Sequence, residues 1–160
     1  RGQCGINACK RGILMRFLYY DRIETIEPNR SITGIKTFAL SEEFFRGHFT
    51  KEPLVPGVIY IEAMAQLLGW LIIYSNDFRL SAVMTLIEGV SISPSLRPGF
   101  KADIYGEILN SSMRDTLGRA WMVVEGKEVA RIDRIIYTHF RDVKGDMLKR
   151  WFYYYSGIKT

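Results

Sequence analysis

Residues 58–74, with the sequence VIYIEAMAQLLGWLIIY, decide the fold class of this chain. A segment that is apolar on nearly all sides predicts a helix buried inside a protein, without a solvent face. A membrane span needs about 20 apolar residues without charges, whereas this segment carries Glu62 and Gln66 near its start. We therefore expect one long core helix, ended by Asn76-Asp77, and no membrane span.

Segments typical of strands lie on both sides of this helix. The glycines and prolines of residues 41–57 predict a structured loop just before it. Alternating or apolar patterns predict strands over residues 12–25 (alone or after a short helix), 31–40, 82–93, 100–110, 119–125 and 128–139. The last two are expected to form a hairpin. A polar loop is expected at residues 111–118, between the strands at 100–110 and 119–125. This order predicts an α+β domain in which an antiparallel sheet wraps one helix.

Composition and charge narrow the class of protein further. Apolar residues make up 48% and charged residues 24% of the 160 residues, which excludes a disordered or low-complexity chain. Lys and Arg exceed Asp and Glu by five, and the isoelectric point is near 9.3. A basic surplus suits an acidic partner, which from composition alone is nucleic acid, a membrane surface or an acidic protein.

The two ends of the chain differ from the middle. We expect a loose leader over residues 1–12, one domain over 13–140 and a basic, aromatic tail over 141–160. Cys4 and Cys9 form a C-x4-C pair without a second Cys/His pair, so we expect free thiols and no metal site. The tail, with five consecutive aromatic residues from 151 to 155, either docks on the domain as a terminal element, partly irregular, or binds nucleic acid by stacking.

Residues 44–66, FFRGHFTKEPLVPGVIYIEAMAQ, hold the side chains best suited to chemistry. His48 lies in the glycine- and proline-rich loop, and an imidazole is a good general base near neutral pH. Glu62 lies on the second turn of the expected helix, where a carboxyl can act as a general acid. Gln66 is one turn further on the same face and can hydrogen-bond to it. Free N–H groups after Pro56-Gly57 can stabilise an oxyanion.

Each of these residues also has a purely structural interpretation. A histidine after a glycine is commonly a loop residue with a satisfied hydrogen bond, and a glutamate in an apolar helix can be a buried structural carboxyl. Residue types alone therefore leave catalysis and structure both open.

The same segment resembles a known family. The runs IKTFALSEEFFRGHF and PLVPGVIYIEAMAQ are similar to the I-K-x5-E-x-F-F-x-G-H-F-P and P-x-x-P-G-V-x3-E-A-x-A-Q patterns of the 3-hydroxyacyl-[acyl-carrier-protein] dehydratases of the FabZ type. The similarity extends outward over residues 13–139. It includes three further short segments, residues 20–23 (YDRI), 96–99 (LRPG) and 124–130 (VEGKEVA).

The resemblance implies a hotdog fold and a homodimer joined through a continuous sheet, with trimers of dimers as a further assembly. It implies loss of water from a (3R)-3-hydroxyacyl thioester on acyl carrier protein, in the cytoplasm and without a metal or redox cofactor. His48 of one subunit would take the C2 proton, and Glu62 of the other would protonate the leaving hydroxyl. Gly57 would hold the thioester oxygen, Val58 would line the tunnel and Gln66 would orient Glu62. A glutamate at position 62 favours the non-isomerising type.

Some positions depart from the family pattern. Thr50-Lys51-Glu52 replaces the usual Pro-Gly after the histidine, Phe100 replaces an Asp, and residues 14–19 keep little of the N-terminal motif. Two other functions therefore stay open, namely a non-catalytic hotdog subunit that binds acyl chains or scaffolds a partner, and a hotdog acyl thioesterase.

An acidic carrier protein would need a basic rim around the tunnel mouth. The candidates for this rim are Arg46, Lys51, Arg97 and Lys101. The 141–160 tail is a second source of charge, because it supplies +3 of the net +5.

Overall fold

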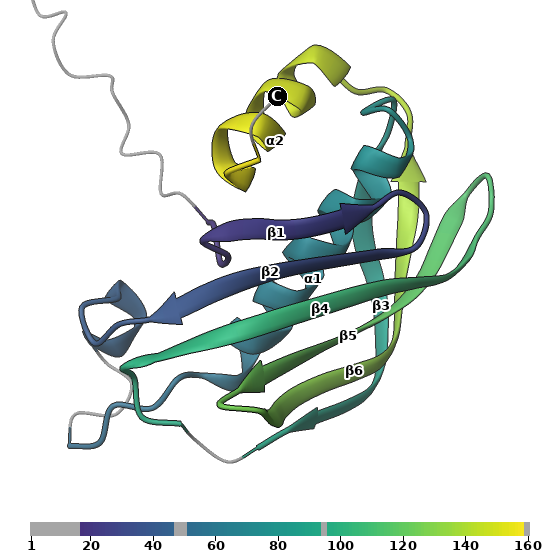
Figure 1. The fold of residues 1–160 in the computed structure, drawn as a ribbon. Coiled ribbons are helices and arrows are strands. Elements are labelled where there is room, and N and C mark those ends of the chain that lie inside the picture. The colour runs from purple at the N-terminus through teal and green to yellow at the C-terminus, as the bar shows by residue number, and fades with distance from the viewer. Residues whose placement is uncertain (1–16, 47–50, 94–95, 159–160) are drawn as a thin grey trace, which may run out of the picture.

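The computed structural model describes residues 17–46, 51–93 and 96–158. Six strands form one antiparallel sheet in the order β1-β2-β4-β5-β6-β3 (Figure 1). The strands are β1 (Arg22–Glu27), β2 (Ser31–Phe38), β3 (Ser81–Ile92), β4 (Phe100–Ser111), β5 (Asp115–Val124) and β6 (Lys127–Phe140). The helices are η1 (Glu43–Arg46, a 3-10 turn), α1 (Gly57–Ser75) and α2 (Gly145–Ser156).

Helix α1 lies on the concave side of the sheet and forms the centre of the core (Figure 1). Eleven of its 19 residues are buried, and Leu67, Leu68 and Leu71 are completely inaccessible. By length and composition α1 could cross a membrane. Its place inside the curved sheet instead makes it the core helix that the sequence predicts.

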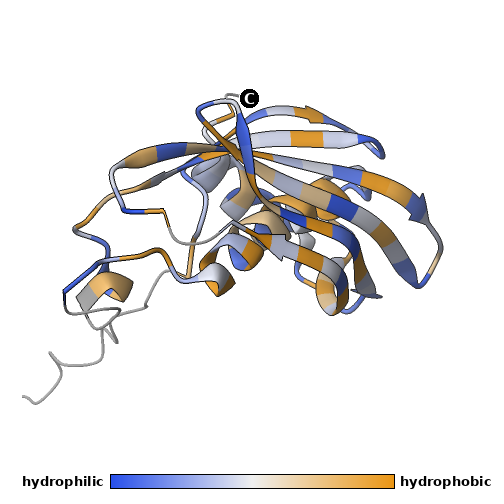
Figure 2. Ribbon diagram, turned by 90° about the horizontal axis from the view of Figure 1, so that it is seen from below, coloured by the Kyte–Doolittle hydropathy of each residue, from blue (hydrophilic) through white to orange (hydrophobic). Residues whose placement is uncertain are grey.

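The sheet approaches α1 closely because small residues lie at the contact. A Cβ atom at Gly118 would lie 2.8 Å from Leu68 Cδ2, and one at Gly34 would lie 2.9 Å from Leu67 Cδ1. Hydrophobic and hydrophilic residues alternate along the strands (Figure 2), as a sheet with one buried face requires. On β4, for example, Ala102 and Ile104 face the helix and are buried.

Most of the expected elements are present, with four differences at their boundaries. Among the described residues of the first segment, from 17 onward, regular structure begins at Arg22. The 3-10 turn η1 lies inside the stretch expected to be a loop. β5 starts at Asp115 instead of residue 119. The expected loop is short because Ser112 closes a tight turn, in which its Oγ accepts hydrogen bonds from the backbone N–H groups of Arg114 and Asp115.

The fourth difference lies in the C-terminal segment. The prediction that its aromatic run is partly irregular is wrong. All five consecutive aromatic residues belong to α2, which ends at Gly157 with a left-handed backbone (φ 74°). Phe152 is completely buried, whereas Trp151 and Tyr154 are exposed. The terminal segment thus docks on the domain, mainly through Phe152 and with Tyr153 and Tyr155 partly buried beside it, as one of the two interpretations of the tail anticipated.

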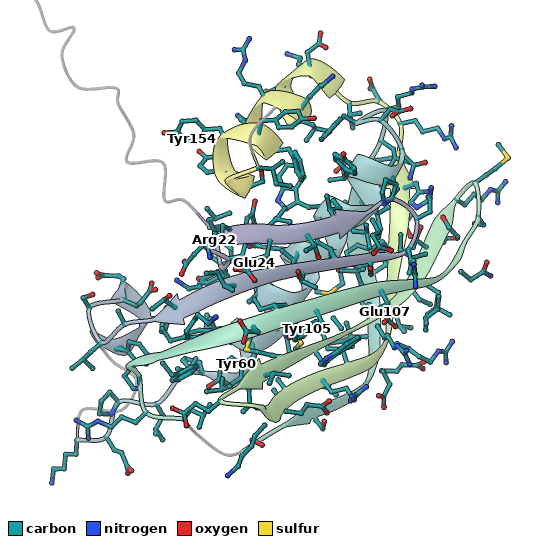
Figure 3. The ribbon with its side chains drawn as sticks, in the orientation of Figure 1. Arg22, Glu24, Tyr60, Tyr105, Glu107 and Tyr154 are labelled. Atoms are coloured by element: carbon teal, nitrogen blue, oxygen red, sulfur yellow. The ribbon has the colours of Figure 1, made fainter. Side chains whose placement is uncertain are left out.

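The two edges of the sheet are unlike each other. β1 has only six residues, and α2 ends beside it, since a Cβ at Gly157 would lie 3.3 Å from Arg22 Cβ. Figure 3 shows the charged side chains of Arg22 and Glu24 along this short strand. β3 has twelve residues, and in the described part of the chain it pairs only with β6. Its exposed apolar residues are Val83, Met84, Leu86, Val90 and Ile92.

Candidate active site

Glu62 and Gln66 occupy successive turns of α1 and form the hydrogen bond that their spacing predicts. Gln66 Nε2 donates to Glu62 Oε1 at 2.8 Å and to the carbonyl oxygen of Phe17 at 2.9 Å. Gln66 Oε1 accepts from the backbone N–H of Tyr19, also at 2.9 Å. The side chain of Gln66 is therefore held at both ends, and it fixes one oxygen of the Glu62 carboxylate.

A cavity of about 720 Å³ opens in front of this pair. One face of α1 forms its floor, through Glu62, Ala65, Gln66, Gly69, Trp70 and Ile73. The other walls come from residues 17–18, from residues 82–84 at the start of β3, from Tyr137 on β6, and from Trp151 and Tyr155 on α2. Glu62 is the only charged side chain among these lining residues. The cavity is thus an apolar chamber that holds one carboxylate, a typical arrangement for binding a largely apolar ligand.

Tyr137 supports the floor of the cavity from below. Its hydroxyl donates to the carbonyl oxygen of Ala65 at 2.7 Å, inside the turn that joins Glu62 to Gln66. Burial, and secondly the charge of Glu62, raise the pKa of Tyr137 well above its usual value. The phenol therefore stays protonated across the physiological pH range and keeps its hydrogen bond to α1.

The N-terminus of α1 forms a second polar feature, beside β3. The first backbone bond of the helix runs from Ile59 N–H to the Pro56 carbonyl at 2.9 Å, so the N–H groups of Gly57 and Val58 precede it. A Cβ on Gly57 would lie 2.9 Å from Ile92 Cδ1, so glycine permits close approach here. Val58 is 68% exposed and therefore available to contact a ligand or a partner. His48 lies outside the described residues.

An ion-pair cluster anchors the segment that leads toward His48. Lys36 on β2 is buried, and its ammonium lies 2.5 Å from Glu42 Oε1 and 3.4 Å from Asp21 Oδ1. Asp21 also accepts a hydrogen bond from the Thr37 N–H at 2.6 Å. Glu42 directly precedes η1. The cluster thus fixes the start of the chain segment that continues to position 48.

The basic residues expected at the tunnel mouth fall into different environments. Arg97 and Lys51 are exposed, and neither forms an ion pair within the described residues. Leu96 brings their two loops together, because its carbonyl accepts from the Val55 N–H at 3.3 Å. Lys101 lies on the outer face of the sheet, where a hydrogen bond to Asp103 (2.9 Å) raises its pKa. The side chain of Arg46, at the end of η1, lies outside the described residues.

Sequence reasoning missed the aromatic end of the cavity and the Lys36 cluster. Trp151 and Tyr155 are distant from the recognised motif, and only the docking of α2 brings them beside Trp70 on α1. The I-K-x5-E spacing contained Lys36 and Glu42, but their contact depends on the chain turning back after β2. His139, the second histidine, bonds through Nε2 to Thr116 Oγ1 at 2.8 Å and does not line the cavity.

Comparisons with solved structures agree with this fold. The dehydratase heterocomplex ApeI:P of Xenorhabdus doucetiae matches with a TM-score of 0.60 at 17% identity, over 76% of this chain and 97% of the other. A thioesterase of Haemophilus influenzae matches with a TM-score of 0.60 at 10% identity, over 76% and 79% of the two chains. At these identities the likeness shows the fold alone, which is the hotdog fold.

Comparisons of sequence identify the family. A FabA-like domain model matches residues 14–133. The 3-hydroxyacyl-[acyl-carrier-protein] dehydratase FabZ of Bacillus subtilis is 36% identical over 119 residues, which are 73% of this chain and 78% of the relative. The FabZ of Pediococcus pentosaceus is 31% identical over 117 residues, 72% and 78% of the two chains. The chain therefore belongs to the FabA-like family and, within it, to the FabZ-type 3-hydroxyacyl-[acyl-carrier-protein] dehydratases.

Proposed function

We propose that this chain removes water from a (3R)-3-hydroxyacyl thioester carried on acyl carrier protein, with Glu62 as the acid and His48 as the base. The observation that carries the proposal is the position of Glu62, because it is the only charged side chain among the described residues that line a large apolar cavity. Gln66 presents this carboxyl in one fixed orientation. An acyl chain suits the apolar walls, and the carboxyl suits the hydroxyl at C3.

The proton transfers follow from these roles. His48 takes a proton from C2, and the electron pair of that C–H bond forms the double bond between C2 and C3. The C3–O bond breaks as Glu62, directly or through a water, gives its proton to the leaving hydroxyl, which departs as water. The reaction yields the trans-2-enoyl thioester, and proton transfer from His48 back to Glu62 resets the site. No electrons are gained or lost, so the reaction needs no redox cofactor.

The start of α1 suits the charge that develops on the thioester oxygen. Deprotonation at C2 moves negative charge onto this oxygen, and an N–H donor at a helix N-terminus stabilises it. In this proposal the Gly57 N–H holds the oxygen and Val58 lines the entrance. Support comes from the position of both residues ahead of the first helical hydrogen bond.

The active site is proposed to form between two copies of the chain. The open edge of β3 and its exposed apolar side chains suit pairing with the same strand of a second copy, which would place His48 of one protomer opposite Glu62 of the other. Trimers of such dimers are a further proposed assembly. The proposed setting is the cytoplasm, with acidic acyl carrier protein docking beside Lys51 and Arg97.

Hydration of crotonyl thioester, the reverse reaction, tests this proposal through the loss of enoyl-thioester absorbance. We expect His48→Ala and Glu62→Gln to lower kcat/KM by about 10²- to 10⁴-fold. Glu125→Gln, in the exposed β5–β6 turn, is the matched control and should keep the wild-type rate. Equal background rates in the wild type and in both site variants would favour a non-catalytic acyl-binding subunit. Release of free thiol without hydration would favour a thioesterase.

A further inference from the structure

We infer that α2 sets the length of acyl chain that this enzyme accepts, with Trp151 and Tyr155 as the wall at one end of the Glu62 cavity. This inference rests on the proposed function, because it takes the cavity to be the acyl site. α2 begins at Gly145, beyond residues 14–133 that match the FabA-like domain. The wall therefore belongs to a part of the chain outside the matched region.

One buried ring fixes α2 against the C-terminal half of α1. The Phe152 ring lies 5.5 Å from Trp70, 5.2 Å from Tyr74 and 5.4 Å from Phe78, measured between ring centroids. Aromatic pairs at such distances are favourable beyond the area that they bury. The N-terminal end of α2 is also in close contact, since a Cβ at Gly145 would lie 2.7 Å from the Phe78 carbonyl oxygen. The helix is thus held against the domain near its middle, at Phe152, and at its N-terminal end, at Gly145.

Two faces of α2 have different surroundings. Trp151 and Tyr155 are four residues apart, so they lie on one face, and both line the cavity. Tyr154 is 69% exposed and points away from the domain (Figure 3). Met147, one turn before Trp151, is also exposed and does not line the cavity. Trp151 and Tyr155 therefore line the cavity, whereas Phe152 supplies the buried anchor.

The geometry of α1 gives the scale of the chamber. Trp70, which contacts the α2 anchor, is eight residues after Glu62. This separation is about 12 Å along the helix axis. An extended zigzag chain advances by about 1.25 Å for each carbon–carbon bond of about 1.5 Å, so the distance corresponds to about nine carbon atoms beyond C3. Every methylene that enters the apolar chamber should improve binding by about fourfold, until the chain meets the wall.

The acyl thioester is thus expected to run from Glu62 along α1 toward Trp70 and to end at Trp151 and Tyr155. Chains up to about twelve carbons fit this path, and longer ones must displace α2 or fold back. Each additional methylene beyond that point loses affinity because it finds no apolar space.

The test compares kcat/KM for hydration of straight trans-2-enoyl thioesters from four to sixteen carbons. In the wild type kcat/KM should rise with length and then fall beyond about twelve carbons. Trp151→Ala and Tyr155→Ala should each raise the ratio of kcat/KM for the sixteen-carbon over the four-carbon substrate by about tenfold. Met147→Ala, on the same helix but outside the cavity, should keep the wild-type ratio.

Two results would overturn different claims. If the wild type hydrates none of the substrates from four to sixteen carbons, the proposed dehydratase activity itself is wrong. If it does hydrate them, and the length ratio of Trp151→Ala and Tyr155→Ala equals that of Met147→Ala, the role of α2 is wrong. Trp151 is 45% exposed, so its truncation should leave the fold intact, which thermal unfolding verifies. If Trp151→Ala nevertheless unfolds, Trp151→Leu gives the same comparison with a smaller change in packing.

Discussion

The side-chain amide of Gln66 lies 2.8 Å from the carboxylate of Glu62 and also bonds to the backbone of Phe17 and Tyr19. This relationship ties the proposed acid to the segment that precedes β1. Gln66→Met keeps the volume but removes all three bonds. We expect kcat to fall by about 10- to 100-fold, because Glu62 loses its fixed orientation, with a smaller change in KM.

Ser75→Ala is the matched control for Gln66→Met. It also removes side-chain hydrogen bonds from α1, to Leu71 and Asn29, but Ser75 lies outside the cavity. Both variants should lower the free energy of unfolding by about 1 kcal/mol, and only Gln66→Met should lower kcat. Equal kcat values in the two variants would contradict the claim that Gln66 positions Glu62.

The ion-pair cluster at Lys36 should matter for both stability and activity. Lys36→Met leaves the carboxylates of Glu42 and Asp21 without their cation. Both are partly exposed, so we expect a loss of about 2 kcal/mol in the free energy of unfolding, less than for a fully buried pair. Denaturant titration measures this loss, and steady-state kinetics should show a lower kcat, since Glu42 fixes the start of the segment leading to His48.

A double-mutant cycle isolates the contact between Lys36 and Glu42. The double variant Lys36→Met/Glu42→Gln should be more stable than the sum of the single changes predicts. Strictly additive losses would mean that the ion pair contributes nothing of its own.

Alkaline pH should destabilise the protein through its buried tyrosines. Burial raises the pKa of Tyr60 from about 10 to about 12, and burial also raises the pKa of Tyr20 and Tyr137. Between pH 10 and 12 the unfolded chain releases protons that the folded chain keeps. The free energy of unfolding is therefore complete below pH 10 and falls as the pH rises through this window.

In the Tyr60→Phe variant the free energy of unfolding should fall less steeply between pH 10 and 12. The Tyr60 hydroxyl has no hydrogen-bond partner within the described residues, so its removal should leave stability at neutral pH unchanged or slightly higher. Denaturant titrations at pH 8, 10 and 11 measure the effect. If the free energy of unfolding falls with pH as steeply in the variant as in the wild type, Tyr60 does not contribute to the alkaline destabilisation.

Pairing through β3 predicts a particular monomeric variant. Leu86→Lys/Val90→Lys adds two charges to the open strand edge, outside the cavity lining. We expect light scattering to report a monomer, with hydration activity lost because each site, as proposed, uses residues of both chains. Leu109→Lys/Met113→Lys adds the same charges around the β4–β5 turn and should remain a dimer with full activity. A dimer in both variants would place the interface elsewhere.

Docking of the carrier protein should depend on the exposed cations near Leu96. Lys51→Glu/Arg97→Glu should raise KM for a substrate on acyl carrier protein by about tenfold at low salt. KM for the same acyl group on a small thiol should stay unchanged, because no protein surface is involved. Arg114→Glu, in the β4–β5 turn, serves as the control. Equal shifts for both substrates would point to a defect in the cavity instead.

Most of the architecture was predictable because it follows from local patterns. The apolar run at residues 58–74 predicted the helix, and the strand patterns at residues 119–125 and 128–139 predicted the last hairpin, each to within a few residues at most boundaries. The early start of β5 was not predictable, because Asp115 and Thr116 are polar and only the Ser112 turn shows where the strand begins.

The candidate site was predictable only where its residues are close in sequence. The hydrogen bond between Glu62 and Gln66 depends on helical spacing and could be foreseen. The contribution of Trp151 and Tyr155 could not, because it depends on how Phe152 packs against α1. Five consecutive residues of a helix point to all sides of it, so they cannot all be buried against one surface. The expectation that all five rings are buried therefore led to the prediction of irregular structure. A helix is compatible with this run because only Phe152 is completely buried, whereas Tyr153 is partly buried and Trp151 and Tyr154 are exposed.

The unequal edges of the sheet limit how copies of this chain can associate. β1 is short, carries charged side chains and lies beside the end of α2, whereas β3 is long and apolar. A sheet that could pair at both edges would add copies without limit and form an open-ended fibre. Pairing of β3 with the β3 of a second copy uses the same surface on both chains, so the assembly stops at two copies. Removing α2 would therefore do more than enlarge the acyl cavity. It would uncover β1 as a second open edge of the sheet, and only the short length and the charged side chains of this strand would then oppose pairing at that edge.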